Sequence, residues 1–145
     1  MFSLTEKEVG LISAQLLKGN VCFFQIDKKK IHHMPDDEDY FNYDLTEEEE
    51  DILDEIEENP DNFAEFTKME PAQEHQMMQD FVDRKIKEKN LAEDLVNALS
   101  KPKASTGFKY LIEESKYSSE WKEYRLSKYH DWVKEQVDSF NYSED

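Results

Sequence analysis

Fifteen Asp and Glu residues lie between Asp36 and Asp61, and this stretch contains no Lys or Arg. It supplies almost all of the formal net charge of −17, because the other 119 residues carry 20 acids against 18 bases. We expect the segment to form a surface that repels polyanions and attracts cationic surfaces or metal ions. The packed interior must then come from the rest of the chain, mainly from its aromatic C-terminal half.

The length of 145 residues suits one domain with one hydrophobic core. Only 37% of the residues are hydrophobic, but 12% are aromatic, and aromatic side chains bury large areas. We therefore expect a folded protein with a very polar surface. The prediction is a mainly helical α+β single domain over residues 1–140, with a small antiparallel sheet of two or three strands near the N-terminus and a frayed tail at residues 141–145.

The single cysteine, Cys22, excludes an intrachain disulfide, which suits a reducing compartment. The first residues have neither the basic nor the apolar segment of a signal peptide. No apolar stretch approaches the ~20 residues that cross a bilayer. The expected location is the cytoplasm, without membrane attachment.

Two capping boxes mark helix starts in the N-terminal half. Thr5 with Glu8, and Thr46 with Glu49, have the spacing at which each side chain can bind the other residue's backbone N–H. The predicted helices span residues 4–18 and 45–59. In the first helix, we expect a buried stripe and a left-handed stop at a glycine. The stripe is Leu11, Ile12 and Leu16, with Val9 near its edge, and the stop is Gly19-Asn20. The second helix has a narrower stripe, formed by Ile52, Leu53 and Ile56.

β-branched and aromatic residues predict two short strands between these helices, over residues 21–26 and 31–34. The turn between them, Asp27 to Lys30, contains no glycine. Strand alternation places His32 and His33 on opposite faces. A third short strand is expected within residues 62–69.

From Pro71 to the end of the chain, apolar spacing predicts helices only. The first should bury Met77, Met78, Phe81 and Val82. A second spans residues 91–99, with Leu91, Leu95, Val96 and Leu99 in register. A third spans residues 108–115. The last and longest begins at Ser118 or Ser119 and carries a broad aromatic face.

The second half of the chain also resembles a family of small acidic bacterial proteins known only as an uncharacterised protein family. The likeness covers residues 70–133. Its features are the pattern Glu74, Met77, Met78, Phe81, the amphipathic segment 91–99, the pair Phe108-Lys109, the motif Trp121-x-x-Tyr124 and the late Trp132. The family's Gly-Ala-Phe is replaced here by Lys103-Ala104-Ser105. The resemblance implies a shared architecture but no activity, cofactor or substrate.

Charge segregation favours a non-catalytic interaction or regulatory module whose acidic face meets a basic protein partner. Aromatic residues interleaved with the acids would add apolar anchors to the long-range attraction. The predicted partner-binding residues are Asp36, Asp37, Asp39, Tyr40, Phe41, Glu48, Asp51 and Glu55. Self-association is a further option, because residues 84–128 carry eleven bases against seven acids and could attract the acidic stretch of another copy.

Two other functions stay open. A small enzyme could use His32 or His33 with carboxylates, with or without a metal, although no metal-binding or nucleophile motif is present and no cofactor is expected. A weak association with nucleic acid could use the bases of the C-terminal half. These bases are Lys101, Lys103, Lys109, Lys122, Arg125 and Lys128. The overall negative charge opposes that association.

Overall fold

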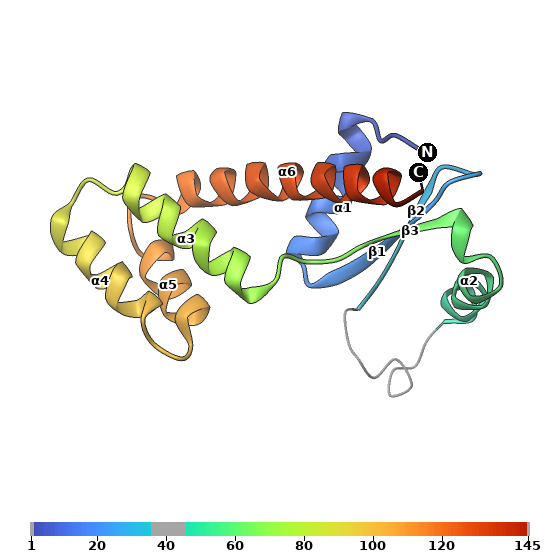
Figure 1. Ribbon diagram of the computed structural model, residues 1–145. Helices are drawn as coiled ribbons and strands as arrows, with labels where there is room; N and C mark the ends of the chain where they lie inside the picture. The colour runs from blue at the N-terminus through green and yellow to red at the C-terminus, as the bar shows by residue number, and fades with distance from the viewer. Residues whose placement is uncertain (1, 36–45, 145) are drawn as a thin grey trace. The chain divides into compact units, whose positions relative to one another are not determined.

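The computed structural model describes residues 2–35 and 46–144, with side chains up to residue 142 (Figure 1). Its elements are, in chain order, α1 (Glu6–Leu17), β1 (Asn20–Gln25), β2 (Lys30–Pro35), α2 (Glu47–Glu58), the 3₁₀ helix η2 (Pro60–Asn62), β3 (Phe63–Phe66), α3 (Pro71–Lys85), α4 (Lys89–Leu99), α5 (Ala104–Glu113) and α6 (Ser118–Glu144). The predicted mainly helical α+β fold with a small antiparallel sheet near the N-terminus is confirmed.

The chain forms two compact units. Unit 1 comprises residues 1–68 and 130–145, and unit 2 comprises residues 69–129, so that helix α6 contributes to both. The single domain over residues 1–140 stays a prediction.

The sheet of unit 1 has the strand order β2-β1-β3, and both pairings are antiparallel. Strand β1 is central: its Phe23 lies opposite His32 of β2 and Glu65 of β3. The turn between β1 and β2 needs one left-handed residue, and Lys29 takes that conformation with φ 55° in place of a glycine. Strand β3 is the third strand expected within residues 62–69, and it covers only Phe63–Phe66.

Alternation along β1 sends its side chains to two different helices. Val21 and Phe23 belong to a buried cluster with Met34 and Phe63, and helix α2 packs against this cluster. The intervening Cys22 is fully buried, with its Sγ 4.0 Å from the carbonyl oxygen of Ile12 in α1. Burial raises the pKa of the Cys22 thiol to about 12. Cys22 is therefore a small buried side chain of the interior.

Helix α1 begins with the expected capping box, in which Thr5 Oγ1 accepts from Glu8 N and Glu8 Oε1 accepts from Thr5 N. Gly19 follows the helix at φ 94°. The buried stripe differs from the prediction, because Leu11 is 50% exposed and Val9 is buried. The observed stripe is Val9, Ile12, Ser13 and Leu16. This i, i+3, i+4, i+7 spacing matches the helical repeat, and Leu11 lies beside it.

The N-terminus of unit 1 is held by the last turns of α6. The backbone N–H of Phe2 donates to Asn141 Oδ1 over 2.9 Å, and Asn141 Nδ2 donates to the Phe2 carbonyl over 2.8 Å. The Phe2 ring stacks on Phe24 and meets Phe140 edge to face. Helical structure therefore continues past residue 140, to Glu144.

Unit 2 has an all-helical core rich in aromatic rings. Helix α3 buries Met77, Met78, Phe81 and Val82, as the sequence predicts. The Trp121 ring of α6 makes edge-to-face contacts with Phe81 and with Phe108 of α5, at centroid distances of 5.1 and 4.9 Å. These contacts join α3, α5 and α6 into one packed interior.

The predicted register of α4 is wrong at Val96, which is 44% exposed. The helix buries Leu95, Ala98 and Leu99 instead. At about 100° per residue, Leu95 lies between Ala98 and Leu99 on the helix surface, and Val96 lies beyond Leu99, outside the arc that the neighbouring elements cover. An apolar side chain is thereby left at the surface between α3 and α4.

Candidate functional site

The most strongly charged element of the described structure is helix α2. Thr46 Oγ1 accepts from Glu49 N, and Glu49 Oε1 accepts from Thr46 N, which completes the predicted capping box. Residues 47–50 are all glutamates and lie in the first turn, where the positive end of the helix dipole favours negative charge. The capping box and the helix dipole therefore both stabilise the N-terminal end of this helix.

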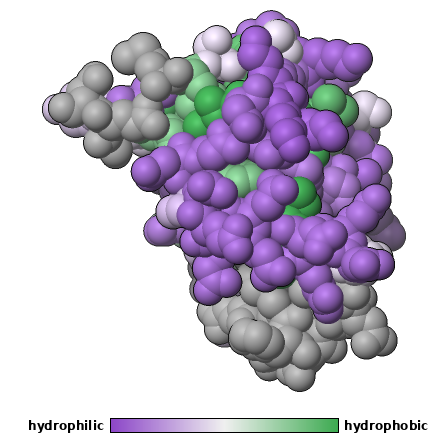
Figure 2. Space-filling view, turned by 90° about the vertical axis from the view of Figure 1, so that its right-hand side faces the viewer, coloured by the Kyte–Doolittle hydropathy of each residue, from purple (hydrophilic) through white to green (hydrophobic). Residues whose placement is uncertain are grey.

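Packing decides which way the carboxylates of α2 point. Ile52, Leu53 and Ile56 lie against the apolar face of the sheet formed by β1, β2 and β3. The opposite face of the helix is then left to solvent. The exposed acids of α2 as a whole are Glu47, Glu48, Glu50, Asp51, Asp54, Glu57 and Glu58. Figure 2 looks onto the side of the molecule where α2 lies in Figure 1, and the surface there is mostly hydrophilic, with only scattered hydrophobic spots.

Four ion pairs of the described residues lie outside α2. They join Glu6 to Lys134, Glu74 to Arg125, Glu88 to Lys116 and Glu113 to Lys109. No Lys or Arg lies in the last turn of α2, where a base would suit the negative end of the dipole. The outer face of the helix is thus a one-signed surface, as the sequence predicts for this segment.

A groove of about 690 Å³ runs between strand β2 and the first half of α2. Glu48, Glu49 and Asp51 line it from the helix, and His32 and His33 line it from the strand. Its apolar lining includes Ile31, Met34, Pro35 and Ile52. Lys30 also lines the groove, so that three carboxylates face one base. The groove therefore combines a net negative charge with apolar surface, the two properties that a basic and partly apolar segment requires for binding.

A polar network lies beside this groove. Gln25 is buried, and its Nε2 donates to Glu55 Oε2 over 3.3 Å, while its Oε1 lies 3.1 Å from His32 Nε2. A hydrogen on His32 Nε2 would satisfy Gln25 Oε1, which favours that tautomer of the neutral ring. Burial, and then the positive charge of Lys30, lower the pKa of His32 from its usual value. The network holds the imidazole in place and favours its neutral form.

The structure brings together two of the predicted partner-binding residues, Glu48 and Asp51, which both line the groove. Glu55 points elsewhere: it is half-buried and bound to Gln25. The other predicted residues, Asp36, Asp37, Asp39, Tyr40 and Phe41, lie outside the described residues.

Sequence reasoning missed Gln25 and the apolar lining of the groove. The period-2 alternation of residues 30–35 could have placed Met34 and His32 on the face beneath α2, but only the fold shows that α2 covers that face.

In residues 2–35 and 46–144, no three His, Cys, Asp or Glu side chains lie close enough together to hold a metal ion. His32 and His33 contribute to one groove although they belong to opposite faces of β2, because β2 is an edge strand of the described sheet.

The bases predicted to form a nucleic-acid surface are partly engaged within unit 2. Arg125 pairs with Glu74 over 3.5 Å and lies over the Tyr129 ring, and Lys128 lies over the Tyr124 ring. Tyr129 is fully buried and donates to the same Glu74 over 2.6 Å. These contacts direct positive charge toward groups of the protein itself.

Residues 35–144 match the model of an uncharacterised protein family (UPF0158). The chain belongs to this family. The matched range contains α2 and the whole of unit 2, whereas α1, β1 and nearly all of β2 precede it. Neither the curated proteins nor the solved structures include a match to the chain. In the described part of the chain, every helix is too short or too polar to cross a bilayer.

Proposed function

We propose that this protein is a non-catalytic interaction module whose helix α2 and adjoining groove bind a basic segment of a protein partner. The observation that carries the proposal is the pairing of seven exposed acids on α2 with a groove that holds both carboxylates and apolar side chains. Net charge alone would give only diffuse attraction, whereas a groove can fix one segment in one register.

The two parts of the site have different tasks. The acids of α2 create a negative potential that attracts and orients a cationic segment at long range, an effect that raises association rates and falls with salt. Glu48 and Asp51 lie at the groove, where a Lys or Arg can pair with them at close range. Met34 and Ile52 offer contact to the apolar side chains of the same segment.

The edge position of β2 suggests the shape of the bound segment. Within residues 2–35 and 46–144, β2 pairs with β1 on one side only, and extended peptides commonly bind by adding a strand to such an edge. A segment in which basic and apolar residues alternate would present one kind to the carboxylates and the other to the groove floor. The partner segment is therefore an extended one.

The free, buried thiol of Cys22 is in keeping with a function in the cytoplasm, where thiols stay reduced.

The test compares two variants that lose the same charge. Glu48→Gln with Asp51→Asn changes the groove, and Glu57→Gln with Glu58→Gln changes exposed acids at the other end of α2. Binding of a fluorescent peptide with alternating Arg and Leu is measured by anisotropy. We expect the groove variant to weaken binding about tenfold or more, which corresponds to about 1.4 kcal/mol, and the control variant to weaken it about twofold. Equal losses in both variants would reduce the site to diffuse charge and remove the groove from the proposal.

A second candidate function is a reaction that uses His32 as a base, and the observation that favours it is the presence of two histidines and three carboxylates around one groove. The lowered pKa of His32 keeps the ring neutral near pH 7, as a general base requires. Titration of the protein with Zn²⁺ and Mn²⁺ tests the metal-assisted form: a stoichiometric site lost in the variant His32→Gln would favour it, and weak binding unchanged by that variant would dismiss it.

A further inference from the structure

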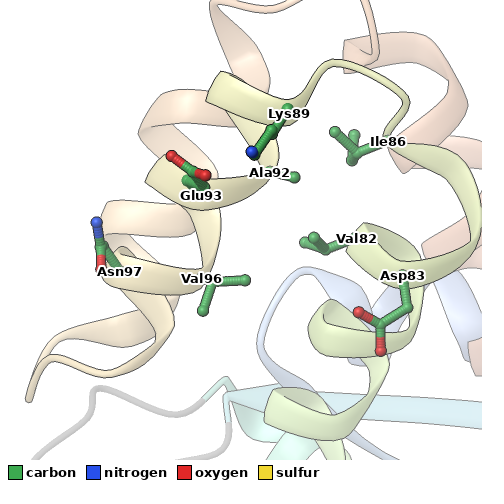
Figure 3. A pocket seen from close by; sticks show the side chains of 8 residues that line it. All are labelled: Val82, Asp83, Ile86, Lys89, Ala92, Glu93, Val96 and Asn97. Carbon is green, nitrogen blue, oxygen red and sulfur yellow. The ribbon is translucent and has the colours of Figure 1, made fainter.

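A second groove lies in unit 2, between helices α3 and α4, and has a volume of about 640 Å³. Figure 3 shows Val82 and Ile86 directed into it from the side of α3, and Ala92 and Val96 from α4. Four apolar side chains therefore face one another across the gap. This α3/α4 groove shares no residue with the groove beside α2.

Part of this apolar surface is open to solvent. Val82 is buried, Ile86 and Ala92 are half-buried, and Val96 is 44% exposed. The apolar residues of α4 recur in helical register, yet the fold buries only one side of that pattern, with Leu95 and Leu99 packed inward. An apolar strip between two helices is a surface on which a third, amphipathic helix can pack.

Charged residues around the strip are arranged unevenly. Asp83 on α3 and Glu93 on α4 are exposed, and each lines the groove from its own side. Lys89, the first residue of α4, lies at the end where α3 and α4 are connected (Figure 3). The sides of the groove are thus negative, and one end is positive.

We propose that the α3/α4 groove binds an amphipathic helix of a partner protein, one whose apolar stripe is flanked by Lys or Arg. The stripe would cover Val82, Ile86 and Val96, and the flanking bases would meet Asp83 and Glu93. Lys89 fixes the direction, because a helix places partial negative charge at its C-terminus and would set that end beside a base. The bound helix therefore has its C-terminus at the α3–α4 connection.

A second copy of this chain fits the groove less well. Two copies with a net charge of −17 repel each other, whereas a basic helix is attracted from a distance. The most acidic helix of the chain, α2, would also bring carboxylates toward Asp83 and Glu93. Charge complementarity thus selects a basic helix of another protein.

The experiment uses the whole chain and a synthetic helical peptide of about four turns, with Leu at helical spacing and Lys on both flanks. A scrambled peptide of the same composition, in which Leu has no helical spacing, reports attraction by charge alone. Anisotropy titrations at ~0.15 M salt compare the two, because exposed charges are largely screened beyond about 8 Å under that condition. We expect the amphipathic peptide to bind at least about tenfold tighter than the scrambled one.

Two variants separate the parts of the site. Val96→Asn removes apolar surface at an exposed position without a change of charge, and Asp83→Asn with Glu93→Gln removes the flanking acids. Each should weaken peptide binding about tenfold, whereas the charge-matched control Asp94→Asn with Glu114→Gln, at exposed positions off the groove, should weaken it less than about twofold. Circular dichroism confirms that each variant is folded.

Three results would overturn the proposal. One is equal binding of the amphipathic and scrambled peptides, and another is unchanged binding in Val96→Asn. The third is a dimer in sedimentation experiments that Val96→Asn dissociates, since the occupant would then be a second copy. The variant Glu48→Gln with Asp51→Asn should leave peptide binding at this groove within about twofold, so failure here and failure of the α2 site can be told apart.

Discussion

The two compact units differ most in how their charges are balanced. Unit 1 carries 24 acidic and 7 basic side chains, whereas unit 2 carries 11 of each, so the whole net charge of −17 belongs to unit 1. In unit 2, acids and bases interleave along the helices, and ion pairs such as Arg125 with Glu74 form within it. In unit 1, the carboxylates of α2 stand together on one face.

The cores of the units also differ. Unit 1 buries a sheet between α1 and α2, and α2 contributes only three half-buried apolar side chains to that packing. Unit 2 buries interlocked aromatic rings from three helices. Helix α2 is therefore held by a narrow apolar contact against the repulsion of its own charges, whereas the helices of unit 2 have broad contacts and little net charge to oppose them.

The largest effect is expected in the core of unit 2. Phe108 is fully buried and contacts the Trp121 ring, so Phe108→Ala removes apolar area and leaves a cavity. Truncations of this kind destabilise proteins by about 3–5 kcal/mol. Tyr110→Ala, on the same helix but 64% exposed, should change stability by about 0.5 kcal/mol or less. Urea denaturation followed by tryptophan fluorescence measures both, and similar losses in the two variants would contradict the assignment of the core.

Removal of acids from α2 is expected to raise the stability of the protein. Asp54→Asn, Glu57→Gln and Glu58→Gln together remove like-charge repulsion and two acids at the negative end of the helix dipole. We expect a gain of about 1 kcal/mol at low salt, which falls as salt screens the charges. A matched variant of unit 2, Asp94→Asn with Glu114→Gln and Glu123→Gln, should gain less. Thermal melts at ~10 and ~500 mM NaCl measure the stability of both variants. Equal gains in the α2 variant and the unit 2 variant would show that charge imbalance is not specific to unit 1.

The smallest expected effect is a change of stability with pH, caused by His32 in unit 1. The folded-state pKa of His32 lies below its usual value of 6.5, so the unfolded chain binds the proton more tightly. Stability should therefore fall as pH decreases through the region just below 6.5, and this contribution should be absent in His32→Gln. Denaturation at pH 8 and pH 5 measures it, with His33→Gln as a control for the loss of a histidine. If wild type and His32→Gln lose the same stability over this range, the Gln25 network does not hold the ring neutral.

Local patterns predicted most of the elements. Both capping boxes, the left-handed Gly19, the three strands and the buried face of α3 follow from short-range spacing, and the structure confirms them. The errors, Leu11 and Val96, have one cause. Each lies on an apolar helix surface broader than the stripe that the neighbouring elements cover, and sequence periodicity does not say where such coverage ends.

The candidate site was predictable only in part. The concentration of acids in α2 is a property of the sequence, and so is the expectation that they remain at the surface. The groove, in contrast, depends on His32 and Met34 lying beneath α2, and these residues are separated from Glu48 and Asp51 by more than a dozen positions. Long-range pairing of this kind arises from burial of the apolar face of the sheet, which no local pattern encodes.

The sequence by itself determined that this protein has one strongly acidic helix, a small sheet and an aromatic helical interior, because propensity, capping and charge act over a few residues. The tertiary structure decided which side of each helix is covered, and thereby which carboxylates face a groove and which apolar side chains stay open to solvent. Those choices come from competition among distant apolar surfaces for a limited interior, and only the folded chain resolves that competition.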